Sequence, residues 1–339
     1  MKRFIIRLFP LAVLLCLYSC NENRIDASEE PEYITMRFGF DGDQSSTDTK
    51  ASSDGNLYGI NVLYDSKKDG NIDTRYAYGL FDNKQDMVIQ LLSGYKYEFR
   101  CTLVKNGKNT LYYGQYGGNT YPGYANPFQT NTASSTALTN SFVYGSSTYL
   151  SGIRSGDAII KTTGGYVEQS IPSIERYYGE VTGYAPVVGG IVTIPLKRTV
   201  FGVRFMIGSV PEGTLGASCT LSSPASTIWQ ASTGNNVYDS GAIIYSFPDV
   251  YNCWKNETPL SANVGWTFTS SVFDQWNQNG TQTVSFKRNV LTTVTIGCTP
   301  DNATANLLLT EESIGENNNI YLYLNSDGII VIGVDPDPE

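Results

Sequence analysis

The sequence of 339 residues contains no histidine. Imidazole is the usual general base near neutral pH and a common zinc ligand, so its absence excludes Ser-His-Asp catalysis, Cys-His catalysis and histidine-ligated zinc. Carboxylate pairs of the kind that glycosidases use remain available. Even so, a chain of this length without histidine is more typical of a protein that binds or assembles than of an enzyme. We expect no catalytic residues and no cofactor.

The chain is also poor in charge, and in positive charge above all. Lys and Arg together number 23 against 32 Asp and Glu, which gives a formal net charge of −9. An acidic surface repels phosphate backbones, so we expect no nucleic-acid partner. Glycine and tyrosine are abundant instead, at 33 and 24 residues, which is typical of β-rich extracellular proteins with long loops.

Cysteine pairs with metal-binding or redox spacing are missing as well. Four cysteines lie beyond the N-terminal segment, and no two of them have C-x-x-C spacing. They are compatible with up to two disulfides in an oxidising compartment or with buried free thiols, and the sequence favours neither state. We expect no metal site. The four are Cys101, Cys219, Cys253 and Cys298.

The chain begins with a segment that has the features of an export signal. Three cations precede an apolar run over 8–17, which is shorter than the roughly 20 residues that a spanning helix needs. Ser19 then places a small residue directly before Cys20, as in a lipoprotein cleavage site. We predict a lipoprotein signal peptide over 1–19, acylation of Cys20, and an acidic tether over 20–31 that leads from the outer membrane to the fold.

The first strand signal stands apart from the others. Residues 33–40 alternate between polar and strongly apolar positions, which predicts a strand with one buried face. The next segment, 41–56, is polar and broken by glycine, so we expect it to be flexible. Within it, Lys50 and Ala51 form a candidate site for a trypsin-like protease, since exposed polar segments are the usual sites of cleavage.

Short strands with glycine turns fill the rest of the chain, and no segment has a convincing helical period. A hairpin is predicted over 57–81 and another over 319–332, each with an Asp-Gly turn. The longest strand-like run covers 191–207, where we expect Pro195 to break the strand or to lie on a sheet edge. The pattern predicts an all-β fold of β-sandwiches. We divide it into an N-terminal domain over 32–190 and a C-terminal domain over 191–339.

A loop rich in tyrosine is the candidate binding surface. Aromatic faces stack on sugar rings and provide large contact areas at protein interfaces, so this loop is a candidate for carbohydrate or partner contact. The alternative is a long loop folded back on the sandwich with its rings half buried. The tyrosines are Tyr112, Tyr113, Tyr116, Tyr121 and Tyr124.

Two sets of acidic residues are candidates for chemical sites. Residues 65–73 repeat Asp and Asn at short spacing, but Lys67 occupies a ligand position of the calcium-loop pattern, so a polar hairpin turn is the simpler interpretation. Nothing in the sequence fixes a pair of carboxylates at a catalytic separation. The carboxylates considered are Glu168, Glu175, Glu180, Asp249 and Glu257.

Taken together, these features resemble the fimbrillin family of Bacteroidetes, the lipoprotein-derived subunits of type V pili and related adhesins. Three segments carry the resemblance: the cleavage site at 17–20, the strand 33–40 with the following Thr49-Lys50-Ala51-Ser52, and the strand 193–201. The resemblance implies two tandem transthyretin-like β-sandwiches. It also implies cleavage after the first strand, in a family where arginine is commoner than lysine at that position.

The resemblance further implies assembly by β-strand donation between pilus subunits, in which a strand from a neighbouring subunit fills the place of the removed strand. Here the donor would be 320–324 or 329–332. We therefore expect a non-enzymatic fimbrial subunit or a surface adhesin that contacts a host or bacterial ligand. Stalk, anchor, tip and standalone roles stay open. The alternatives are a lipid-anchored glycan-binding protein and a histidine-free glycosidase.

Overall fold

The protein is almost entirely β-structure, as the sequence predicts. Its described helices are one turn of 3-10 helix, η1 (Lys84–Asp86), and two short α-helices, α2 (Gly107–Thr110) and α3 (Val250–Asn256), and the rest of its described regular structure is strand. None of these helices is long and apolar enough to span a bilayer. The computed structural model describes residues 31–43, 55–112, 115–116, 119–120, 123–155, 161–163, 166–168, 175–207, 214–221, 228–232, 238–270, 278–299, 304–314, 320–324 and 330–334.

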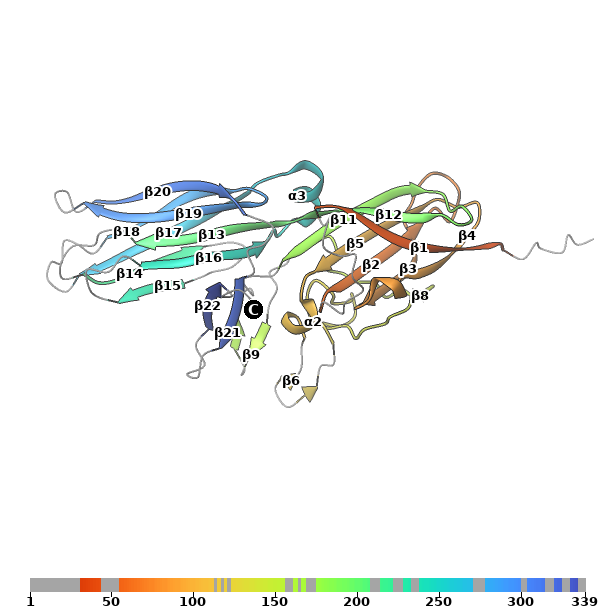
Figure 1. Cartoon of the computed structure of the whole chain (residues 1–339), viewed down its shortest axis with the longest axis horizontal. Coiled ribbons are helices and arrows are strands. Elements are labelled where there is room, and N and C mark those ends of the chain that lie inside the picture. Colours follow the sequence, from red (N-terminus) through yellow and green to blue (C-terminus); the bar gives the residue numbers. More distant parts are fainter. Residues whose placement is uncertain are drawn as a thin grey trace, which may run out of the picture.

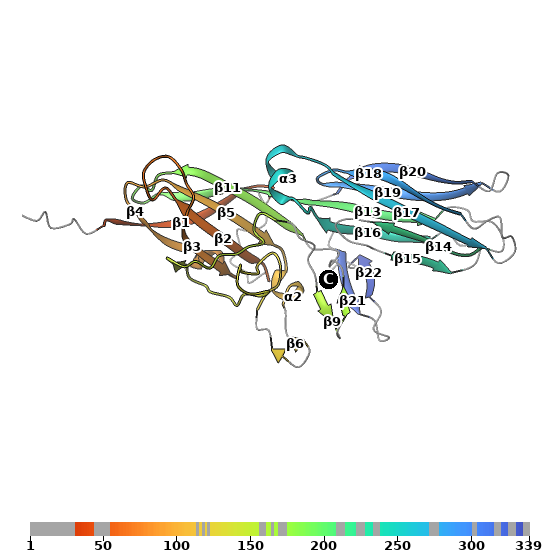
Figure 2. The ribbon, with the colours of Figure 1, turned by 180° about the vertical axis from the view of Figure 1, so that it is seen from behind.

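The described strands form two larger β units that lie end to end (Figures 1 and 2). The N-terminal unit is an eight-stranded sheet in the order β4-β1-β12-β11-β5-β2-β3-β8. Two-stranded pairs, β6 with β7 and β9 with β10, accompany it. The strands are β1 (Tyr33–Gly42), β2 (Leu57–Tyr64), β3 (Thr74–Phe81), β4 (Val88–Leu92), β5 (Tyr97–Val104), β6 (Gln115–Tyr116), β7 (Asn119–Thr120), β8 (Val143–Tyr144), β9 (Lys161–Thr163), β10 (Tyr166–Glu168), β11 (Arg176–Tyr184) and β12 (Ile191–Arg198).

The eight-stranded sheet curls so that its two halves share one hydrophobic core. Buried side chains from β4, β1 and β12 lie in the same cluster as those from β5, β2 and β3. Phe38 of β1, for example, packs against Phe99 of β5 with ring centroids 5.5 Å apart. The alternation of apolar residues in the sequence therefore corresponds to the inner faces of a curled sheet.

The C-terminal unit is a sandwich of two four-stranded sheets. Their orders are β16-β13-β19-β20 and β15-β14-β17-β18, and a shared cluster of buried side chains packs the sheets face to face. Phe201 lies in that cluster, against the rings of Tyr245, Phe247 and Phe286. The strands are β13 (Val200–Ile207), β14 (Thr214–Leu221), β15 (Ile228–Ser232), β16 (Tyr238–Ser246), β17 (Leu260–Ser270), β18 (Gln278–Phe286), β19 (Val290–Thr299) and β20 (Thr304–Ser313).

A hairpin follows the second unit. Strands β21 (Ile320–Leu324) and β22 (Ile330–Val334) pair antiparallel with each other, as the sequence predicts. Among the described strands, neither pairs with a third. This hairpin is thus separate from the sheets of both units.

The chain leaves the N-terminal sheet after β12, which is later than the predicted boundary at residue 190. Strand β12 (Ile191–Arg198), assigned from sequence to the second domain, lies between β1 and β11 in the first sheet. The long run therefore divides at Thr199, directly before β13. Strand β12 continues through Pro195 without a break. Around Pro195 it pairs with β1 on one side only, which is the edge-like position that the sequence allowed as the alternative. Proline is tolerated there because the ladder to β11 covers only 197–198, so no β11 residue pairs with Pro195.

The segment 123–155 folds back on the sheet. Phe128, Leu150 and Ile153 are buried in a second cluster with residues of β2, β3 and β5. Arg176, fully buried at the start of β11, fixes this segment: its guanidinium donates to the carbonyl oxygens of Gly152 at 2.8 Å and Ile153 at 3.0 Å. Of the tyrosine-rich loop itself, the described Phe128 lies in this buried cluster.

Two of the four cysteines considered for disulfides are free buried thiols, Cys101 and Cys253. Burial raises the pKa of both, that of Cys253 to about 12. Because the thiolate is the reactive form, we expect neither to react with a maleimide reagent in the native protein at about pH 7.5, and both to react in about 6 M guanidinium. Mass spectrometry of the labelled peptides tests this; native labelling of Cys101 would contradict it. The side chains of Cys219 and Cys298 lie outside the described residues.

Candidate functional site

Strand β1 is inserted between two strands rather than added at an edge. Its second half pairs in parallel with β12, from Arg37 opposite Ile191 to Gly42 opposite Leu196. Its first half pairs antiparallel with β4, from Tyr33 opposite Leu92. Figure 1 shows β1 crossing the sheet beside β12 and β4. Withdrawal of β1 would therefore leave unpaired backbone on both neighbours.

The inner face of β1 supplies part of the core. Ile34 and Met36 are 7% and 0% exposed, while Tyr33 and Thr35 face outward. Further along, Phe38 and Phe40 are half-buried and pack against the same cluster. At about 25 cal/mol per Å² of apolar surface, these four side chains contribute several kcal/mol to the binding of the strand. The apolar alternation seen in the sequence thus forms one wall of the core.

Tyrosine hydroxyls attach β4 to strands β3, β5 and β8 across the curled sheet. Tyr76 donates to the carbonyl oxygen of Gln90 at 2.7 Å, and the Gln90 amide donates to the Tyr144 hydroxyl at 2.9 Å. The Leu92 amide donates to the Tyr97 hydroxyl at 2.8 Å. Since β4 pairs with no described strand other than β1, these bonds are its second attachment. They favour a groove that keeps its shape when β1 leaves.

Burial raises the pKa of the tyrosines that close the sheet, that of Tyr76 to about 12, and those of Tyr97 and Tyr144 also upward. The unfolded phenol loses its proton near pH 10, so between pH 10 and pH 12 the unfolded state binds fewer protons and stability falls as pH rises. We expect Tyr76→Phe to lose about 1 kcal/mol at about pH 8 and to show a shallower decline in alkali. Urea unfolding from neutral to alkaline pH measures both; an unchanged alkaline slope would contradict the assignment.

The end of β1 is fixed between the two units. The Asp43 carboxylate accepts from the Arg198 amide at 3.0 Å and from Nη1 of Arg288 at 2.8 Å. Arg288 belongs to the turn between β18 and β19, and its Nη2 donates to Glu257 at 3.0 Å. The residue before Asp43 has to be glycine, because Gly42 has a φ of +98° and a Cβ there would lie 2.3 Å from the carbonyl oxygen of Leu196.

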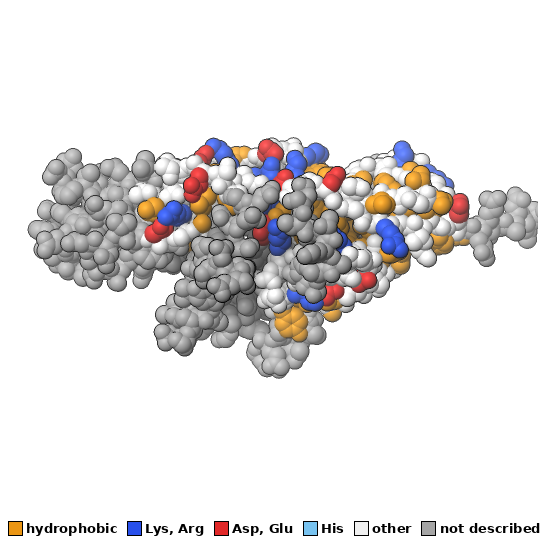
Figure 3. All heavy atoms as spheres, viewed as in Figure 1, with side chains coloured by type: hydrophobic (Ala, Val, Ile, Leu, Met, Phe, Trp, Pro, Cys, Tyr) orange, Lys and Arg blue, Asp and Glu red, His pale blue; other side chains and the backbone are white. Residues whose placement is uncertain are grey.

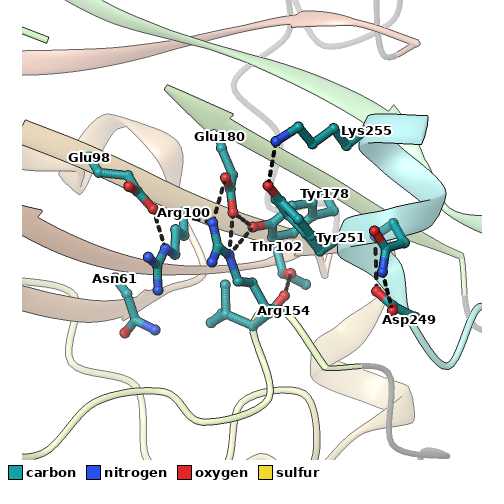
Figure 4. A network of polar contacts seen from close by, with 12 residues as sticks. Asn61, Glu98, Arg100, Thr102, Arg154, Tyr178, Glu180, Asp249, Tyr251 and Lys255 are labelled. Atoms are coloured by element: carbon teal, nitrogen blue, oxygen red, sulfur yellow. Dashed lines mark hydrogen bonds and ion pairs between the residues drawn. The ribbon is translucent and has the colours of Figure 1, made fainter. Parts of the chain in front are cut away.

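Helix α3 carries the other contacts between the units. The Trp254 ring meets Tyr178 edge-on at 5.7 Å, and its Nε1 donates to the carbonyl oxygen of Pro195 at 3.2 Å. Nearby, Arg154 pairs with Glu180 and stacks on Tyr251, its guanidinium carbon 4.3 Å from the ring centroid (Figure 4). Figure 3 shows Lys, Arg, Asp and Glu side chains interspersed on the described surface of this face.

The predicted site residues fall partly outside the described chain. Cys20, Lys50, Ala51, Tyr113 and Tyr121 do so entirely, and the side chain of Tyr116 does as well. Tyr112 is 52% exposed, whereas Tyr124 is only 7% exposed and belongs to the buried cluster. Their rings meet edge-on at 72°. These two tyrosines therefore do not form the coplanar exposed face that sugar stacking would use.

A surface cavity of about 260 Å³ lies between β2, β3, β5 and the segment 146–149. Its aromatic residue, Tyr149, is covered on one face by Arg75, whose guanidinium carbon is 3.7 Å from the ring centroid. Arg75 also donates to the carbonyl oxygen of Ser147. This ring face is thus already occupied, and the cavity adds no support to a glycan-stacking role.

The acidic residues considered as chemical sites make structural contacts. Asp65 accepts from the amides of Asp69 and Gly70, so its carboxylate closes the turn that the sequence suggested. No group of three or more metal-ligating side chains occurs within the described ranges. The side chain of Glu168 lies outside them. The other four carboxylates pair with arginines or cap helix α3: Glu175 with Arg198, Glu180 with Arg154, Glu257 with Arg288, and Asp249 with the Asn252 amide.

No protein-family model and no curated protein sequence matches the chain. Among solved structures it is similar to a Bacteroides eggerthii protein described as a cell adhesion protein, with 11% identity over 84% of this chain and 96% of the other, and a TM-score of 0.36. It is also similar to the fimbrial anchor protein Mfa2 from Porphyromonas gingivalis, with 9% identity, coverages of 84% and 98%, and a TM-score of 0.34.

A third similar structure is a fimbrial assembly protein from Parabacteroides distasonis, with 12% identity, coverages of 89% and 97%, and a TM-score of 0.29.

Proposed function

We propose that this protein is a non-enzymatic subunit of a surface fimbria, or a fimbrillin-like adhesin, in which β1 is a replaceable strand. It is exported as a lipoprotein through Cys20 to the outer membrane, and its partners are other subunits. The observation that carries the proposal is the placement of β1 between β12 and β4. While it is in place, an inserted strand with an apolar inner face fills the groove between its neighbours. Once it is removed, the unpaired backbone of those neighbours becomes a template for β-strand addition.

The proposed sequence of events needs no chemistry beyond one peptide hydrolysis. Cleavage at Lys50 separates lipid and β1 from the rest of the chain. Withdrawal of β1 then exposes the backbone of β12 and the pockets of Ile34 and Met36, while tyrosines hold β4 in place. A strand from a second copy fills the groove. Each subunit gives one strand and accepts one, so contacts repeat head to tail and a filament grows.

The test uses residues 21–339 with a site for a highly specific protease in place of residues 46–51. The uncut protein is expected to stay monomeric. After cutting and gentle warming it should form rods in negative-stain microscopy and a ladder on gels that boiling collapses. The matched control carries a scrambled protease site and receives the same treatment. A cut protein that retains its β1 fragment and stays monomeric would show that β1 is a permanent part of the fold.

A further inference from the structure

Exposed hydrophobic side chains gather at one end of the N-terminal unit. In the described part of the chain, seven large hydrophobic side chains are exposed, and six of them lie on or next to strands β4, β1 and β12. The seventh, Tyr112, follows α2. Figure 3 shows hydrophobic side chains over this end of the unit, whereas charged ones gather nearer the junction. The six, which we call the end patch, are Tyr33, Val88, Tyr144, Val187, Val188 and Ile191.

The curled sheet brings four members of the end patch together. Arg37 of β1 lies opposite Val88 on one side and opposite Ile191 on the other, and all three face outward. Tyr33 projects from the same face of β1. Tyr144 joins at the edge of β4, where its hydroxyl accepts from a β4 amide. Burial raises the pKa of the Tyr144 phenol, and the nearby phenol of Tyr33 raises it further.

The turn between β11 and β12 adds two valines that do not pack in the core. Val188 is 84% exposed and Val187 is 59% exposed, and neither belongs to the buried clusters. The turn lies against the first half of β1, because a Cβ on Gly190 would be 2.8 Å from Cγ2 of Val187 and 3.0 Å from Cε of Met36. Contiguous exposed apolar patches mark contact surfaces. The end patch therefore calls for an occupant outside the described fold.

The start of the chain identifies that occupant. Strand β1 begins at this end of the molecule, away from the C-terminal unit (Figures 1 and 2). Residues 21–31, which join the strand to Cys20, span at most about 40 Å when fully extended. A lipid on Cys20 thus keeps the end patch within reach of the bilayer. We propose, resting on the lipoprotein export proposed above, that the end patch lies on the lipid surface of the outer membrane.

The side chains of the end patch suit the boundary between lipid and water. Tyr33 and Tyr144 each combine an apolar ring with a polar hydroxyl, a combination that is enriched at membrane interfaces. Val187 and Val188 project from a turn, so they reach the acyl chains while the sheet stays in water. The strength of such a contact grows with the apolar area removed from water. It adds a fixed orientation to an anchor that is otherwise held only by a tether.

The exposed charges at this end are balanced, although the chain as a whole is acidic. The turn between β4 and β5 lies beside the start of β1, because the Ser93 amide donates to the carbonyl oxygen of Glu32 at 2.8 Å. The turn between β2 and β3 adjoins it, with Nζ of Lys68 4.4 Å from the ring centroid of Tyr95. Anionic headgroups are therefore not repelled. The exposed cations of these turns and of the first half of β1 are Arg37, Lys67, Lys68 and Lys96, and the anions are Glu32, Asp69 and Asp73.

Contact at the end patch also sets where the processing segment begins relative to the membrane. Strand β1 runs from the end patch to the junction between the units, where the Asp43 carboxylate accepts from Arg288. The chain therefore leaves β1 at the end of the N-terminal unit that is farther from the lipid. The segment that contains Lys50 thus starts on the side away from the membrane, where a protease in solution has access.

The test uses uncut residues 21–339 with an N-terminal polyhistidine tag. Vesicles of phosphatidylcholine with a minority of phosphatidylglycerol and a nickel-chelating lipid hold the tag, which stands in for the lipid on Cys20. Hydrogen–deuterium exchange with mass spectrometry compares the tethered protein with the protein in solution. We expect slower exchange on the vesicles for 31–35 and 185–191, and no change around Tyr112. Equal exchange in the two states would overturn the proposal.

A paired variant isolates the two valines. Val187→Ser combined with Val188→Ser changes exposed positions only, so its melting temperature should match that of the parent. On the vesicles it should lose the protection of 185–191, and without the tag its binding in vesicle flotation should weaken about tenfold. The matched control is Tyr112→Ser, which removes the exposed large hydrophobic side chain outside the end patch and should behave as the parent does. Equal protection in the parent and the paired variant would overturn the role of the valines.

The competing occupant is a second copy of the chain. Sedimentation velocity of the uncut protein distinguishes the two: self-association that the paired variant abolishes, without protection on vesicles, would make the end patch a protein contact and overturn the proposal. Mass spectrometry of the exported full chain tests the lipid on Cys20, and its absence would contradict the lipoprotein export and this inference together. Rod formation is measured without lipid, so rods without protection would contradict the membrane contact alone, and protection without rods would contradict the subunit role alone.

Discussion

Arg176→Met is expected to lower the free energy of unfolding of the N-terminal unit by about 3–5 kcal/mol, because it removes a buried donor that serves several buried acceptors. Arg176 is fully buried, and its guanidinium also donates to the Ser155 carbonyl oxygen at 3.2 Å and to Oγ1 of Thr102 at 3.3 Å. Methionine keeps much of the volume but removes the guanidinium donor from these acceptors and from the Gly152 carbonyl oxygen, while the Ile153 carbonyl oxygen keeps only the Thr102 hydroxyl as a donor. Each such buried group costs about 1–3 kcal/mol.

Differential scanning calorimetry and urea unfolding measure this change. The matched control is Arg75→Met, which removes an exposed guanidinium that donates to the Ser147 carbonyl oxygen, and it should cost about 1 kcal/mol or less. Equal losses for the two variants would contradict the view that Arg176 fixes the 123–155 segment on the sheet. Faster proteolysis within that segment in Arg176→Met would support it.

Phe201→Ala should lower the stability of the C-terminal unit by about 3–5 kcal/mol, since it leaves a cavity in a close-packed core. The Phe201 ring has three aromatic neighbours, at centroid distances of 5.2 to 5.6 Å, and is fully buried between the two sheets. Phe201→Leu retains most of the volume and should lose less, about 1–2 kcal/mol.

Tryptophan fluorescence is a suitable probe for this variant, because all four tryptophans of the chain follow residue 200. In urea, Phe201→Ala should shift the fluorescence transition to lower concentration. The calorimetric transition that Arg176→Met shifts should move much less. If each variant moved both transitions equally, the two units would unfold as one, and the proposed division into two domains would be wrong.

The sequence predicts the central strand of the candidate site but not the strand's partners. The alternation over 33–40 predicted β1, and the structure confirms a strand from Tyr33 to Gly42 with an apolar inner face. Its insertion between β12 and β4 was not predictable, because strand partners far apart in the chain are chosen by packing and not by local pattern. Asp43 was missed as well, since it lies in a polar segment, 41–56, that was assigned as flexible.

Strand β11 (Arg176–Tyr184) is the clearest case of a local signal that failed. It is central in the first sheet, yet its sequence contains two glycines, and the charged residues Arg176 and Glu180 are both buried. Buried charge is tolerated only with partners, and these come from the 152–155 segment. A one-dimensional pattern that treats charge as exposed cannot find such a strand.

The sequence by itself determined the fold class, the positions of most strands and the terminal hairpin, because alternation and glycine turns act locally. Only the tertiary structure decided that β12 belongs to the first sheet, that Tyr124 is buried, and that β1 ends against Arg288. Each depends on contacts between distant segments, whose free energy arises only when the chain has folded.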